Sequence, residues 1–136
     1  MSRPWIVSRC LNDASLSALI GNRFWSSTRI REDDSTRVLT KPFCVYRMST
    51  ETSDFRGDDS LRIRRRVYQI FVHDTPGDYT RIDSILVLLE GLFRDVEDQA
   101  NSIVRCEWLE NSEDFRDDDM GTILRYCRIQ TKVRET

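Results

Sequence analysis

The alternation of apolar and polar side chains is clearest between residues 75 and 96. Its apolar residues recur at the i, i+3, i+4, i+7 spacing that places them on one side of an α-helix. They are Ile82, Ile85, Leu86, Leu89, Leu92, Phe93 and Val96. We expect Thr75 to cap this helix, with Pro76 in its first turn and Asp78 near the positive end of the helix dipole. An apolar stripe of this width needs a sheet to cover it.

Four other segments are rich in the β-branched and aromatic residues typical of strands. They are residues 43–48, 61–73, 103–109 and 123–133. The first two flank a polar stretch, and together they predict a hairpin with an extended, charged tip. A short helix of about two turns is predicted after Asn12 and Asp13, both of which are cap candidates, and before the stop at Gly21-Asn22.

The order of these elements predicts an α+β fold. Strand, strand, helix, strand, strand, behind a short N-terminal helix, indicates an antiparallel β-sheet of about four strands packed by one long helix. At 136 residues the chain fits a single domain, residues 1–136. Three long polar loops complete the expected fold, at residues 26–40, 49–60 and 110–121.

Loops of this length are uncommon in a small domain and usually carry a function. We expect residues 26–40 to run over the surface and to become ordered against a partner. Because the three loops carry no catalytic groups in a recognisable arrangement, their predicted role is binding.

The charge balance narrows the choice of partner. Twenty-one Lys and Arg residues face 23 Asp and Glu residues, for a net charge of −2, which argues against a general nucleic-acid binder. All but Lys41 and Lys132 of the basic residues are Arg, whose planar fork suits bidentate contacts at protein interfaces. The same charged residues are also compatible with a surface that is solvated and has no protein partner. No apolar run approaches the ~20 residues of a membrane span, and the N-terminus lacks a signal core, so we expect no membrane partner.

The residues that most often carry catalysis form no motif. His73 is followed by Asp74, and a histidine with an adjacent carboxylate can act as a general base. No motif supplies a nucleophile for it, so we expect His73 to lie at the surface or at a sheet edge. The cysteines are scattered without the short spacing of a zinc site, so we expect buried thiols. They are Cys10, Cys44, Cys106 and Cys127.

The acidic run at Asp117, Asp118 and Asp119 raises the question of a Mg²⁺ site. The strand after it is similar to the carboxylate-x-Lys strand of metal-dependent nucleases, but Gln130 stands where the carboxylate should be. Three aspartates on a loop are most simply a solvated turn. We therefore expect no enzyme activity, no metal and no cofactor.

One basic cluster remains, at Arg62, Arg64, Arg65 and Arg66. On a strand, Arg62, Arg64 and Arg66 share one face. The paired aromatics of RNA-binding sheets are missing, so we expect an exposed polar face, or a face paired with acidic residues of a neighbouring subunit. A small nucleic-acid-binding module that uses this cluster stays open as an alternative.

Four stretches of the sequence form one further pattern: LNDASLSALIGNRF at 11–24, KPFCVYR at 41–47, VYQIFVHDTPGDYTRIDSILVLLEGL at 67–92 and ILRYCRIQTKV at 123–133. In this order they resemble the tail terminator, or tail completion, proteins of long-tailed bacteriophages. The resemblance implies a structural virion protein that forms a homo-hexameric ring. Such a ring caps the head-proximal end of the tail tube, stops its polymerisation and joins the tail to the head.

The resemblance also implies the partners of the chain. These are copies of itself, the tail tube protein, a head-side connector or head-completion protein, and phage DNA that passes through the channel without sequence-specific binding. The protein would be made in the host cytoplasm and end in the tail or neck of the virion. A different head–tail connector or a tube component of the same virion is the alternative within this class.

The charge pattern fits a ring. Arg-rich and Asp-rich surfaces give the complementary patches that head-to-tail contacts need, and acidic loops would let DNA slide past by repelling phosphate. We expect either the loop with Asp54, Asp58 and Asp59 or the loop with Asp117, Asp118 and Asp119 to face the lumen or an axial partner. The predicted interface or lumen residues are Asp54, Asp58, Asp59, Arg62, Arg64, Arg66, Asp117, Asp118 and Asp119.

Overall fold

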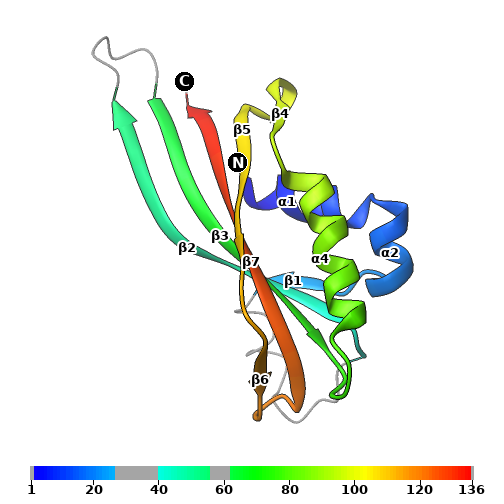
Figure 1. Cartoon of the computed structure of the whole chain (residues 1–136). Coiled ribbons are helices and arrows are strands. Elements are labelled where there is room, and N and C mark those ends of the chain that lie inside the picture. Colours follow the sequence, from blue (N-terminus) through cyan, green and yellow to red (C-terminus); the bar gives the residue numbers. More distant parts are fainter. Residues whose placement is uncertain (1, 27–39, 56–61, 136) are drawn as a thin grey trace.

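A computed structural model of the chain describes residues 2–26, 40–55 and 62–135. Its helices and strands form two layers, a curved sheet and a group of helices beside it (Figure 1). The helices are α1 (Ser2–Leu11), α2 (Ala14–Ile20), α4 (Thr80–Phe93) and the single-turn η1 (Gln99–Asn101). The strands are β1 (Phe24–Ser26), β2 (Phe43–Phe55), β3 (Arg62–Asp74), β4 (Val96–Asp98), β5 (Ile103–Asn111), β6 (Phe115–Asp117) and β7 (Thr122–Glu135).

The sheet is mixed and larger than predicted. Seven strands in the described ranges follow the order β1-β2-β3-β7-β5-β4, with β6 paired to β7. The pair β1–β2 is parallel and the other pairs are antiparallel. The predicted antiparallel sheet of about four strands under one long helix is therefore wrong. The additional strands β1, β4 and β6 have three residues each, too few to show the alternation by which strands are recognised in a sequence.

The hairpin of β2 and β3 is longer than its apolar residues suggest. The two strands pair from Phe43↔His73 to Phe55↔Arg62, with a bulge between Met48 and Thr50. Residues 49–55, predicted as part of a polar loop, therefore belong to β2, because backbone pairing with β3 continues where the apolar pattern stops. The predicted loop 110–121 likewise contains β6. Most of the predicted loop 26–40, and the tip of the hairpin at 56–61, lie outside the described residues.

The short helix is confirmed, including its ends. The Asp13 carboxylate accepts a hydrogen bond from the Leu16 N–H (2.9 Å), and Gly21 ends α2 at φ 60°. The long helix starts later than predicted, at Thr80. Gly77, at φ 139°, turns the chain before it, and the Asp78 carboxylate accepts the Thr80 N–H (2.9 Å), so Thr75 is not the cap. Helix α1 was not predicted.

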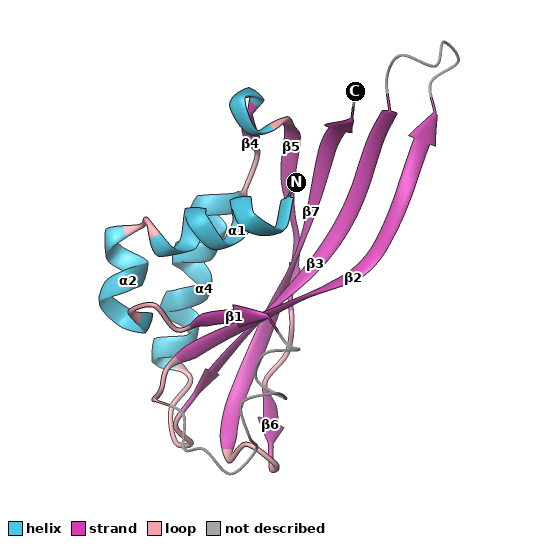
Figure 2. Ribbon diagram, turned by 180° about the vertical axis from the view of Figure 1, so that it is seen from behind, coloured by secondary structure: helices cyan, strands magenta, loops and turns pink. Residues whose placement is uncertain are grey.

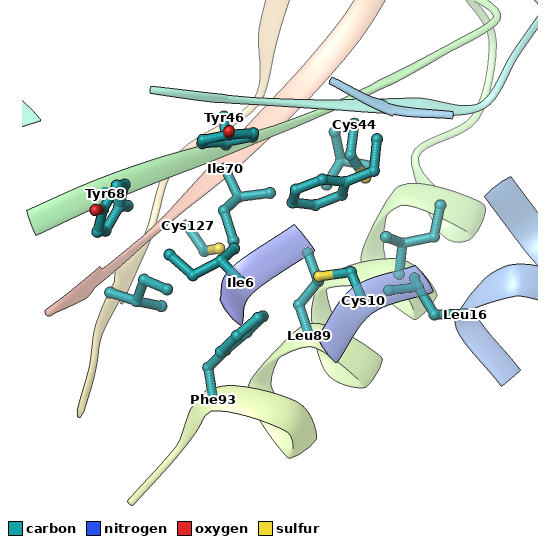
Figure 3. Packing of buried hydrophobic residues seen from close by; sticks show 14 of the residues in the cluster. Ile6, Cys10, Leu16, Cys44, Tyr46, Tyr68, Ile70, Leu89, Phe93 and Cys127 are labelled. Atoms are coloured by element: carbon teal, nitrogen blue, oxygen red, sulfur yellow. The ribbon is translucent and has the colours of Figure 1, made fainter. Parts of the chain in front are cut away.

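The apolar stripe of α4 faces the core, as predicted, but the helix ends at Phe93, and Val96, predicted on the same stripe, lies in β4. The buried residues of α4 are Ile82, Ile85, Leu86, Leu89 and Phe93. Figure 3 shows Leu89 and Phe93 beside Ile6 of α1, with the sheet residues Ile70 and Cys127 across from them. All four cysteines are buried, which confirms the predicted thiols. Burial raises the pKa of Cys44 and of Cys106 to about 12.

Candidate interaction surface

The two faces of the sheet differ in what they contact. Helices α1, α2 and α4 lie on one face (Figure 2). Tyr68, Ile70 and Ile129 are buried on that side. Since neighbouring residues of a strand point to opposite faces, the residues between them in sequence lie on the other side, which we call the open face. The open face carries Arg47, Gln69, Phe71, Tyr126, Arg128, Gln130 and Lys132.

One end of the open face is aromatic and acidic. Tyr126 of β7 lies between two rings from neighbouring strands. The Phe115 ring of β6 stacks on it with centroids 5.9 Å apart, and the centroid of the Phe71 ring of β3 lies 5.3 Å away. These rings and the turn that joins β6 to β7 line a hollow of about 510 Å³, which we call the acidic groove. Its lining residues are Phe71, Phe115, Arg116, Asp117, Asp118, Asp119, Leu124 and Tyr126.

The fold holds the walls of this groove and leaves its charges accessible. The Tyr79 hydroxyl donates to the Phe115 carbonyl (2.9 Å), and the Asp117 carboxylate accepts the Met120 N–H (3.1 Å). Asp118 makes a single long contact with Arg116, 3.6 Å between Nε and Oδ1, and both side chains are largely exposed. Asp119 is exposed as well. The acidic groove therefore presents carboxylates at its rim that the fold itself does not require.

The other end of the open face carries cations. Arg65 and Arg105 both lie directly opposite Lys132, one on each side of β7, and we call these three residues the basic row. Like charges opposite each other across strands destabilise a sheet. Two carboxylates offset part of this repulsion. Glu107 lies 3.5 Å from both the Lys132 and the Arg105 nitrogens, and Asp95 pairs with Arg105 at 2.9 Å. Arg65 has interactions of its own as well. Arg134 follows on the same face of β7 and is exposed.

The predicted basic cluster lies differently from the expectation. Arg64 and Arg66 point to the helix side of the sheet, are partly buried and pair with Glu51 of the same chain, at 2.8 and 3.4 Å. Arg66 also lies 3.4 Å from the Ser2 hydroxyl at the start of α1. These two residues are therefore half-buried and paired within the chain instead of forming the expected exposed polar face, and for Arg66 the start of α1 adds to the cover.

The remaining predicted residues belong to the end of the hairpin. Asp54 pairs with Ile63 and Arg62 with Phe55 in the β2–β3 register, and the side chains of Asp54 and Arg62 are not described. Asp58 and Asp59 lie outside the described residues. In Figure 1 the hairpin end is at the top of the view and β6 is at the bottom. The structure thus keeps the Arg62–Arg66 and Asp117–Asp119 sets apart instead of bringing them together.

His73 is buried, which corrects the expectation of a surface or edge histidine. Its ring stacks on Phe43 at 4.8 Å, and its Nδ1 lies 2.8 Å from the Thr122 hydroxyl. Burial lowers the pKa of His73 to about 4. The adjacent Asp74 pairs with Arg81 and does not orient the imidazole. Within the described ranges, no group of three or more His, Cys, Asp or Glu residues is placed to hold a metal ion.

Sequence reasoning missed the aromatic wall of the groove and the basic row. Phe115 lies in a segment predicted as loop, and the row forms only when three strands come into register. The sequence signalled one member of the row, because alternation along 123–133 places Lys132 on the same face as Tyr126 and Arg128.

The fold is similar to that of a chain in a solved structure described as the virion of a native gene transfer agent (GTA) particle. The TM-score is 0.70 at 12% sequence identity, and the match covers 96% of this chain and 92% of that chain. No protein-family model matches the sequence, and no curated protein does. At this identity the likeness shows a shared fold. No helix of the described residues is long and apolar enough to cross a membrane.

Proposed function

We propose that this chain is a structural protein of a phage-like particle, and that it acts there as the tail terminator. The observation that carries the proposal is the fold likeness to a chain of a gene transfer agent virion, which extends over almost the whole of both chains. The sequence resemblance to tail terminators rests on the separate stretches 11–24, 41–47, 67–92 and 123–133. The two lines of argument agree on the class of protein.

In this role, copies of the chain form a closed ring of six on the head-proximal end of the tail tube. The ring stops addition of tube subunits and offers its other side to the head connector or a head-completion protein. Head-to-tail rings need different patches on two sides of each subunit, and the separated acidic groove and basic row supply such patches. The net charge of −2 is compatible with DNA that passes through without being gripped.

Removal of the chain from its particle tests this function. In a phage or transfer agent that lacks the gene, we expect electron micrographs to show overlong tails or tails without heads, because nothing stops the tube or joins it. Supply of the wild-type chain from a plasmid should restore tail length. Tails of normal length that carry heads in the deletion strain would refute the proposal.

A further inference from the structure

We infer that the basic row of one copy, together with Arg134, docks into the acidic groove of the next copy, and that this is the contact that closes the ring. The inference rests on the proposed function, since it names the surfaces by which the ring subunits meet. It commits to a second copy of this chain as the occupant of the groove.

The chemistry of the groove fits arginine. A guanidinium can stack its flat face on an aromatic ring while its N–H groups pair with carboxylates. Phe115 and Tyr126 offer such rings, and Asp118 and Asp119 stand at the rim. A purely apolar segment would bury these carboxylates without partners, which is costly.

The basic end of the open face keeps charge that an acidic partner can meet. Arg105 pairs with Asp95 at 2.9 Å, and it shares Glu107 with Lys132 at 3.5 Å from each. Lys132 therefore makes only this long contact, and Arg134 is exposed with no ion pair seen among the residues that the structure describes. Carboxylates from outside can pair with Lys132 and Arg134 without displacing a closer partner.

The two patches lie too far apart to meet within one copy. Asp119 precedes the start of β7 and Arg134 lies near its end, so the strand separates them by roughly 40 Å at ~3.3 Å per residue. In Figure 1 the two ends of β7 lie at opposite ends of the molecule. Complementary patches at opposite ends of a subunit give a heterologous contact, which generates a ring when the rotation closes. A second copy is thus the partner whose charge and geometry match both patches.

Charge reversal tests the contact. Asp118→Lys with Asp119→Lys reverses the groove, and Lys132→Asp with Arg134→Asp reverses the row. Ala18→Lys with Asn22→Lys, two exposed positions on and after α2, adds positive charge elsewhere as the control. The size distribution of each full-length protein is measured by mass photometry over a range of concentrations, alone and with purified tail tubes.

We expect each reversed protein to need a roughly tenfold higher concentration to form rings, because two exposed ion pairs become repulsive. The control should assemble like the wild type. A 1:1 mixture of the groove and row variants should restore rings, since each patch then meets its opposite.

The other outcomes separate the inference from the function it rests on. Rings of the wild type that are unaffected by either reversal would overturn the inference and leave the proposed function standing. A wild-type protein that stays a single subunit on tail tubes would overturn both. A particle of two copies only, paired face to face, would overturn the head-to-tail contact. Loss of salt-dependent DNA retention on filters in the row variant, with rings intact, would assign the row to nucleic acid instead.

Discussion

Burial of the only histidine predicts a defined loss of stability in mild acid. His73 is 6% exposed, between the Phe43 ring and the Thr122 hydroxyl, and burial lowers its pKa from 6.5 to about 4. Because the unfolded chain has the higher pKa, it binds the proton first as the pH falls. The stabilisation is thus complete above about pH 6.5 and is lost between 6.5 and about 4. The whole effect is about 3 kcal/mol, of which about 2 kcal/mol falls between pH 7 and pH 5.

The His73→Gln variant isolates this contribution. Gln can still hydrogen-bond to Thr122 but does not titrate, so the wild type should lose about 2 kcal/mol more than the variant between pH 7 and pH 5. Urea unfolding at both pH values measures the difference. The pKa of Asp98 is held low by hydrogen bonds, first from Asn101, and this group is common to both proteins. Equal losses in the two proteins, or an imidazole NMR titration near pH 6.5, would refute the reasoning.

Three further predictions concern the fold that carries the surface. Arg81→Met should cost about 2 kcal/mol in urea unfolding, because it leaves the buried Asp74 carboxylate without the guanidinium that pairs with both its oxygens; a silent variant would contradict this. Leu89→Ala should cost about 3 kcal/mol by thermal unfolding, against less than about 0.5 for the exposed Val87→Ala, and equal effects would mean that α4 packs by another face. The four buried thiols should react with Ellman's reagent at pH 8 only after unfolding, and rapid reaction of the native protein would contradict their burial.

The helices were predictable from the sequence only where a local pattern marks them. The stripe of α4 was predictable because its apolar residues recur over four turns, and the caps of α2 because Asp13 and Gly21 act locally. The start of α4 was missed because Gly77 and Asp78 form a turn that a capping rule based on Thr75 overlooks. Helix α1 was missed because it has only ten residues, too few turns for its apolar Trp5, Ile6 and Cys10 to stand out as a stripe; these residues are buried in the core cluster with α4 and the sheet.

The sheet departs further from the prediction for a physical reason. Residues 49–55 have little apolar content, and their strand conformation comes from pairing with β3, which is thirteen residues long. Such pairing depends on the partner strand and leaves no local signature in the sequence. The burial of His73 has the same origin, because the ring that covers it is Phe43, thirty residues earlier in the chain.

The surface was predictable in its charges and not in its arrangement. Asp117, Asp118 and Asp119 line a groove, and their expected place at an interface or lumen stays a prediction. Arg64 and Arg66 were expected to be exposed, but both pair with Glu51, and Arg66 also lies against the start of α1. The basic row draws one residue from each of three strands, and no spacing along the chain reveals a set that only the register assembles.

The most direct test of the whole account is a cryo-EM map of the intact particle that encodes this chain. We predict a closed ring of copies of the chain at the head-proximal end of the tail tube, with the Asp117–Asp119 turn of each copy against Lys132 and Arg134 of the next. A map in which the chain is absent from the particle, or is present as a lone subunit away from the tube end, would contradict the account.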